Sequence, residues 1–140
     1  MKKTLIAIVM GTILVGCAAT EPAVTESSLK EAGLAPLTAA QLTQTFADNT
    51  WAGIGPRSGR DVVTFYAKDG TFKVKVGNSQ DTGTWRITKD NLFCNKFTRF
   101  DKGVERCWRF YNDGKYYRMF DTNGAPYGKW TVTKGNSQNL

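Results

Sequence analysis

Few residues in this chain could carry out acid–base or nucleophilic chemistry. The sequence contains three cysteines and no histidine, so neither a Ser–His nor a Cys–His nucleophile system can be built. Most acidic residues of the C-terminal two thirds fall in turns, where Asp normally accepts hydrogen bonds from the backbone. These residues are Asp69, Asp81, Asp90, Asp101 and Asp113. We therefore expect a protein that is not an enzyme and that binds no cofactor or metal ion.

The first cysteine follows a segment typical of a secretory leader. A basic start over residues 1–3 precedes an apolar run over residues 4–16, which is too short to cross a membrane as a helix of about 20 residues. The run ends in Leu14-Val15-Gly16-Cys17, which resembles the lipobox of bacterial lipoproteins. That resemblance implies cleavage before Cys17, a diacylglyceryl group on its thiol and acylation of its freed amine. The alternative is an ordinary signal peptide with a chance cysteine.

Lipidation would fix both the location and the first domain boundaries of the protein. Two or three acyl chains make a stable membrane anchor, and Ala18 in place of Asp implies, by the same resemblance, sorting to the outer membrane. We expect residues 1–16 to be a signal peptide and residues 17–36 to be the lipidated N-terminus with a flexible tether. A short helix around Ser28 to Gly33 is the alternative for part of this tether. An exported protein is not expected to meet nucleic acid.

The two remaining cysteines are predicted to form a disulfide. With Cys17 lipidated, Cys94 and Cys107 are an even pair in an oxidising compartment. Closing this short loop would contribute about 3 kcal/mol through the entropy of the unfolded chain. A metal site is a poor alternative, because the chain has no histidine and no second cysteine pair.

One short helix and eight strands are predicted beyond the tether. Thr38 and Gln41 have the spacing of a capping box, and Leu37 with Leu42 has that of a hydrophobic staple, which predicts a helix over 39–47. From residue 50 the apolar period changes to two, and Gly-containing turns punctuate the sequence. The predicted strands are 50–54, 61–67, 71–76, 83–88, 91–98, 104–112, 115–121 and 127–133.

Short connections require strands that are neighbours in sequence to pair antiparallel, which makes a meander. Closure removes the exposed edges, so we expect residues 37–140 to form a mainly β domain, a small eight-stranded barrel with the helix over one end. The alternation predicts an inward set of thirteen residues, nine of them aromatic, and hence a lumen filled by side chains. The set is Phe65, Phe72, Val74, Trp85, Ile87, Phe93, Phe97, Trp108, Phe110, Tyr117, Met119, Trp130 and Val132.

The outward positions are predominantly basic. Residues 50–140 carry 16 Lys and Arg side chains against eight Asp and Glu, and basic proteins associate with anionic surfaces. Lys73, Lys75 and Arg86 fall on the outward parity of consecutive predicted strands, so we expect them to form one patch. Tyr66, Cys94 and Cys107 have outward parity as well.

The layout resembles a family of small exported bacterial proteins of unknown function. The resemblance rests on the helix at Leu37-Thr38, on Asn49-Thr50-Trp51, on Gly83-Thr84-Trp85 and on the two cysteines, and it spans about residues 37–134. The architecture also looks like a miniature lipocalin-like barrel, a plan shared by small periplasmic inhibitors of lysozyme and of metalloproteases. The first resemblance implies no activity, and the second implies inhibition by analogy of fold alone.

Three functions follow as expectations. The first is a non-catalytic envelope lipoprotein whose outer basic face binds an anionic envelope glycan, a lipid or an acidic protein. The second is an inhibitor of a hydrolase of the lysozyme or protease type, which would act through an exposed loop at Arg57–Arg60 or Arg99–Gly103. The third is a carrier of a small ligand, which a filled aromatic lumen would disfavour.

Overall fold

The computed structural model describes residues 23–140, so the predicted signal peptide and the predicted lipidation site at Cys17 lie outside the described residues. Two helices, α1 (Glu26–Glu31) and α2 (Ala39–Phe46), precede the strands, and a short 3-10 helix, η1 (Phe100–Gly103), joins β5 to β6. The strands are β1 (Asn49–Ile54), β2 (Asp61–Tyr66), β3 (Thr71–Val76), β4 (Ser79–Ile87), β5 (Phe93–Phe97), β6 (Arg106–Asn112), β7 (Tyr117–Phe120) and β8 (Pro126–Lys134). Within residues 23–140 no helix has the length and apolar character needed to span a membrane.

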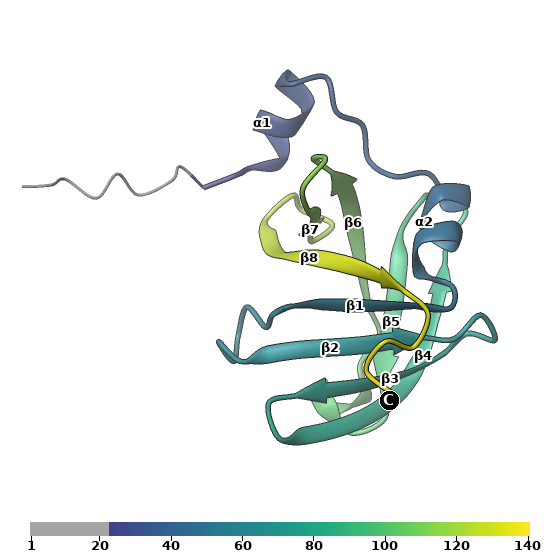
Figure 1. Cartoon of the computed structure of the whole chain (residues 1–140). Coiled ribbons are helices and arrows are strands. Elements are labelled where there is room, and N and C mark those ends of the chain that lie inside the picture. The colour runs from purple at the N-terminus through teal and green to yellow at the C-terminus, as the bar shows by residue number, and fades with distance from the viewer. Residues whose placement is uncertain (1–22) are drawn as a thin grey trace, which may run out of the picture.

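The predicted antiparallel barrel is confirmed. Each strand pairs with the next in chain order, and β8 pairs with β1 to close the ring (Figure 1). The main difference in strand bounds is at β4, which begins at Ser79 because Val76 pairs directly with Ser79 across a two-residue turn. Gly77 in that turn has a φ of 55°, which glycine adopts without steric cost.

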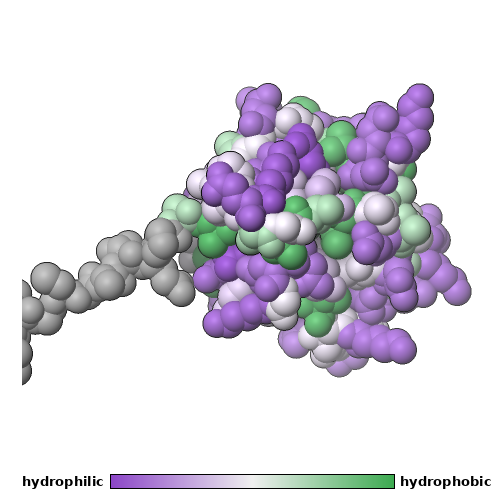
Figure 2. Space-filling view, turned by 90° about the horizontal axis from the view of Figure 1, so that it is seen from above, coloured by the Kyte–Doolittle hydropathy of each residue, from purple (hydrophilic) through white to green (hydrophobic). Residues whose placement is uncertain are grey.

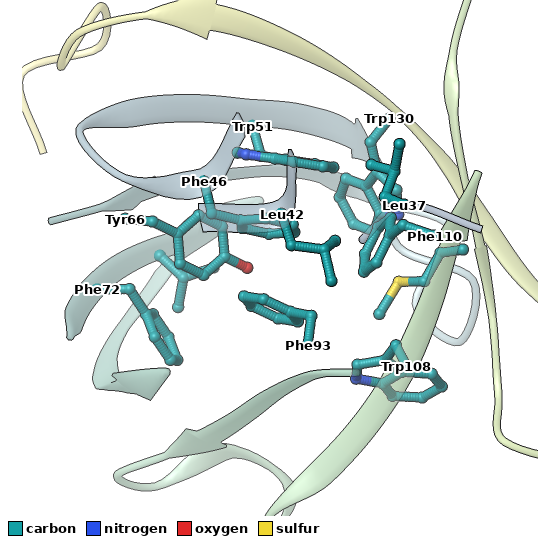
Figure 3. Close-up of a cluster of buried hydrophobic side chains, with 12 residues drawn as sticks. Leu37, Leu42, Phe46, Trp51, Tyr66, Phe72, Phe93, Trp108, Phe110 and Trp130 are labelled. Atoms are coloured by element: carbon teal, nitrogen blue, oxygen red, sulfur yellow. The ribbon is translucent and has the colours of Figure 1, made fainter. Parts of the chain in front are cut away.

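Helix α2 closes one end of the barrel, as predicted. The capping box is present, with Thr38 accepting from the Gln41 amide and Gln41 accepting from the Thr38 amide at 2.8 Å. Leu42 and Phe46 point into the barrel (Figure 3). The Phe46 ring stacks between the rings of Trp51 and Phe93, with centroid separations of 3.9 Å on both sides. The rings of Tyr66, Trp85 and Phe110 also lie near that of Phe46, so α2 inserts its aromatic side chain among five rings of the barrel.

Twelve of the thirteen predicted inward residues belong to or pack against the core, and Phe65 is the exception. Phe65 lies directly opposite Lys73, on the outer face, whereas Tyr66, predicted to point outward, is buried in the core. The segment Val62–Tyr66 is apolar at both parities, so alternation alone does not decide which face points inward. Thr64 lies directly opposite Trp51, which is buried in the core, so Thr64 and Tyr66 take the inward positions and Phe65 the outward one.

Part of the segment expected as a tether, residues 17–36, is folded onto the barrel. Thr25 forms a capping box for α1, and Leu29 packs with Tyr111 and Phe120 on the outside of the barrel. The Glu26 carboxylate accepts hydrogen bonds from the Tyr111 hydroxyl at 2.8 Å and from Arg109 Nη1 at 2.9 Å. The folded body therefore includes α1, in agreement with the alternative of a short helix in this segment, and the described chain has two α-helices where one was expected.

The Glu26 contacts make the docking of α1 dependent on pH. Burial alone would raise the pKa of Glu26, but the hydrogen bond from Tyr111 and the charge of Arg109 hold it below its ordinary value of 4.5. Because the folded-state pKa is the lower one, the carboxylate stabilises docking above about pH 4.5, and this stabilisation is lost as the pH falls through the folded-state pKa.

Replacing Glu26 by Gln is expected to undock α1 partly at neutral pH. The loss of a buried charge-assisted contact should speed hydrogen exchange of the Leu29 amide about tenfold, while the amides of the barrel keep their rates. Glu31→Gln, an exposed position in the same helix, is the control. Unchanged exchange at Leu29 would show that Glu26 does not fasten the helix.

Candidate functional site

The three predicted outer cations do not form one patch. Lys73 and Lys75 are exposed on β3, opposite Thr82 and Gln80. Arg86 lies farther along β4 and donates to Glu105 from Nε at 2.8 Å and from Nη2 at 2.7 Å. These hydrogen bonds raise the pKa of Arg86 and lower that of Glu105. The charge of Arg86 is therefore matched by a neighbour, and the predicted set reduces to two lysines.

Lys73 and Lys75 line an outer hollow of about 780 Å³ whose charges are mixed. The same hollow is lined by Asp61 and Asp81, and Arg99 Nε lies 3.5 Å from a carboxylate oxygen of Asp81. Asp81 also accepts the backbone amides of the β5–β6 connection, from Arg99 at 2.9 Å and from Phe100 at 2.7 Å. This carboxylate is engaged in fastening a loop, and the hollow does not have the uniform sign that would concentrate anions.

The predicted disulfide is confirmed between Cys94 and Cys107, which face each other directly on β5 and β6. A carboxylate oxygen of Glu105 and the two sulfur atoms lie within 4.8 Å of one another. The ion pair of Glu105 with Arg86 therefore lies beside the disulfide, and Cys94 is completely buried despite its outward parity. Both sulfur atoms are used by the disulfide, so this cluster does not offer thiolates to a metal ion.

The lumen holds a cavity, which corrects the expectation of a filled barrel. It has a volume of about 280 Å³. Its wall combines aromatic side chains with shorter ones, which include Val62, Thr64, Val74 and Val76. Eight of the nine aromatic residues predicted to point inward do belong to or pack against the core, yet they leave this space in the lumen.

The indole N–H groups of the core tryptophans differ in whether they have a hydrogen-bond acceptor. Trp108 Nε1 donates to Asn95 Oδ1 at 3.4 Å. The indole of Trp85, which does not line the cavity, donates from Nε1 to the Ala67 carbonyl at 2.9 Å. The side chains of Trp51 and Trp130 do line the cavity. They are 2% and 9% exposed, and their indole N–H groups find no acceptor within residues 23–140. An unpaired buried donor costs about 1–3 kcal/mol, and both of these donors belong to residues of the cavity wall.

At the end of the cavity opposite α2, ion pairs of Asp101 join two loops. Arg57 Nη1 in the β1–β2 connection donates to Asp101 Oδ1 at 3.3 Å, and Arg106 makes two hydrogen bonds to the same carboxylate. The hydrogen bond from Arg106 lowers the pKa of Asp101. The guanidinium of Arg57 also lies 5.9 Å from the centre of the Tyr127 ring. The two loops named as possible inhibitory segments thus meet at the cavity mouth.

Sequence reasoning did not find the cavity residues as a site. The pairing state of an indole N–H depends on which backbone carbonyls the fold brings near it, and no local motif carries that information. The only available signal was one polar residue, Asn95, at the inward parity of Phe93 and Phe97. Thr64 offered no such signal, because the predicted inward position of Phe65 placed Thr64 on the outer face.

Comparison with family models, with characterised proteins and with solved structures yields no match. The assignment of function therefore depends on the geometry described above.

Proposed function

We propose that this chain is a non-catalytic binding protein, held on a membrane outside the cytoplasm by lipid on Cys17, that takes a small ligand into the lumen of its barrel. One observation carries the ligand proposal: two buried indole N–H groups without an acceptor belong to residues that line a cavity. Buried donors in native proteins are nearly always paired. An acceptor on a bound molecule would pair them.

The cavity defines the chemical class of this ligand. Its volume of about 280 Å³ equals that of about nine water molecules in the liquid, which suits a molecule of about ten non-hydrogen atoms. Its walls are largely aromatic and aliphatic. At the mouth, two arginines face a single aspartate, which leaves a net positive charge at the entrance. The best fit is a small, mainly apolar molecule that carries a carbonyl or carboxylate oxygen.

The four tryptophans allow a direct test by NMR, with benzoate and phenylacetate as probes. Titration should move the indole N–H resonances of Trp51 and Trp130 downfield, because these groups gain an acceptor. The resonances of Trp85 and Trp108 serve as internal controls, since both groups already have acceptors. Toluene, which has the apolar body without the oxygen, should shift neither resonance downfield. Equal small shifts at all four indoles would overturn the proposal.

A matched pair of substitutions on β3 separates the lumen from the outer surface. Val76 lines the cavity, and Lys75, its neighbour in sequence, is exposed on the outer face. Val76→Trp is expected to weaken probe binding by more than about tenfold, because the new side chain occupies the ligand volume, whereas Lys75→Trp should bind as the natural protein does. Binding that survives Val76→Trp in a folded variant would place the ligand elsewhere.

The expected attraction to an anionic partner keeps its basis in composition, since residues 50–140 have twice as many basic as acidic side chains. The three residues predicted to bind such a partner, Lys73, Lys75 and Arg86, no longer support it as a set. A different group of cations is better arranged to bind an anionic surface.

A further inference from the structure

Cations gather around one tyrosine on the outside of β7 and β8. The Tyr116 ring centre lies 4.9 Å from Lys129 Nζ, 5.1 Å from Lys115 Nζ and 5.2 Å from Arg118 Cζ. Arg118 is also bound to Asp113. For Lys115 and Lys129, the described part of the chain provides no ion-pair partner. We call Tyr116, Lys115, Lys129 and Arg118 the Tyr116 cluster.

An exposed aliphatic side chain adjoins the Tyr116 cluster. Ile54 at the end of β1 is 54% exposed, and it shares a shallow hollow with Tyr116, Lys129 and Val63. Seen from the α1 side, hydrophilic side chains cover most of the surface, and the hydrophobic ones form small separate areas (Figure 2). This composition suits contact with a charged surface more than burial in an apolar one.

The described chain begins beside the same cluster. Ala23 and Val24 line a second hollow together with Arg118 and Lys129. Ala23 follows Cys17 by six positions, and a chain of that length reaches at most about 20 Å when fully extended. A lipid on Cys17 would therefore keep this side of the barrel within about 20 Å of the membrane surface. In a ring of eight strands, β3 is opposite β7, so Lys73 and Lys75 would face away.

We infer that the outer face of β7 and β8, centred on the Tyr116 cluster, docks on anionic phospholipid headgroups. Lys115 and Lys129 supply positive charge that no acidic side chain of the described residues pairs with. Tyrosine side chains such as Tyr116 favour the interface between water and lipid. The docking face rests on the expected lipid at Cys17 and is independent of the ligand in the lumen. It replaces the predicted β3–β4 patch as the anionic contact of this protein.

Acetylation of lysines on the lipidated protein in vesicles tests the docking face. On vesicles that contain phosphatidylglycerol, Lys115 and Lys129 should react about fivefold more slowly than on pure phosphatidylcholine vesicles, which corresponds to the attraction of one basic side chain to an anionic surface. Lys73 and Lys75 should react equally on both. Salt at about 0.5 M should abolish the difference, because it screens surface charges.

In two single variants, one lysine of the Tyr116 cluster is replaced and the acetylation rate of the other is measured. In Lys115→Gln the protection of Lys129 should fall, and in Lys129→Gln that of Lys115 should fall. The double variant Lys73→Gln/Lys75→Gln, altered on the opposite side of the ring, should keep the full protection of both.

Three outcomes would overturn the inference, and none of them bears on the lumen. One is equal reactivity of Lys115 and Lys129 on both vesicle types, and another is protection of Lys73 and Lys75 in their place. The third is protection by purified anionic glycan but not by vesicles, which would identify a glycan as the partner. Incorporation of labelled palmitate must be checked first, because an unlipidated chain would remove the premise of the docking face.

Discussion

Replacing Phe46 by alanine should lower the free energy of unfolding by about 4 kcal/mol, the usual cost of removing a buried aromatic ring. Phe46 is 1% exposed, and its ring contacts those of Trp51, Phe93 and Phe110 within the cluster that α2 completes. Its loss would leave a hole at the closed end of the barrel. A small domain has about 5–15 kcal/mol in total, so the variant should unfold at a much lower urea concentration.

The control for Phe46→Ala is Thr43→Ala in the same helix. Thr43 is exposed and donates only to the Ala39 carbonyl within α2, so its replacement should change stability by less than about 0.5 kcal/mol. Equilibrium unfolding in urea, followed by tryptophan fluorescence, measures both variants. A cost below about 1 kcal/mol for Phe46→Ala would mean that α2 does not complete the core.

Removal of the disulfide should be the second largest effect, at about 3 kcal/mol for a loop of this size. Cys94 and Cys107 are 13 residues apart and join β5 to β6, whose register comprises three residue pairs, Phe93 with Trp108, Cys94 with Cys107 and Asn95 with Arg106. The cross-link therefore fastens a short pairing, and the double variant Cys94→Ala/Cys107→Ala should lose both the loop constraint and part of that register.

Reduction provides the matching control for the disulfide. With a thiol reductant present, the natural protein and the double alanine variant should unfold at nearly the same urea concentration. Without reductant, the natural protein should be more stable by the full amount. Equal stability of the two oxidised samples would contradict a role for this disulfide in the fold.

Much of the fold was predictable because its determinants are local. The alternation in Phe72-Lys73-Val74-Lys75-Val76 sets the two faces of β3, and the capping box at Thr38 and Gln41 begins α2 at the expected residue. Short turns then require antiparallel neighbours. The disulfide followed from the number of cysteines and the expected compartment, and the structure places the two cysteines directly opposite each other.

The errors share a physical cause, which is that the relevant partners are distant in sequence. The parity of Phe65 depends on pairing with β1, because its own segment is apolar on both faces. The pairing of the Arg86 charge depends on Glu105, 19 residues away. The docking of α1 depends on a contact between Glu26 and Tyr111 across 85 residues. The lumenal cavity depends on where many rings stack, and a count of inward aromatic residues does not locate the remaining space.

The junction between β1 and β8 has a consequence for how fast the protein folds. Thr50 at the start of the barrel donates to the Gly135 carbonyl, 85 residues farther along the chain, and the neighbouring pairs of this junction are almost as distant. Native contacts of such long range slow folding, because the chain loses loop entropy before it gains them. Until β8 arrives, β1 and β7 each present an unpaired edge to other chains. We therefore expect millisecond-to-second folding, with aggregation competing most strongly during that last step.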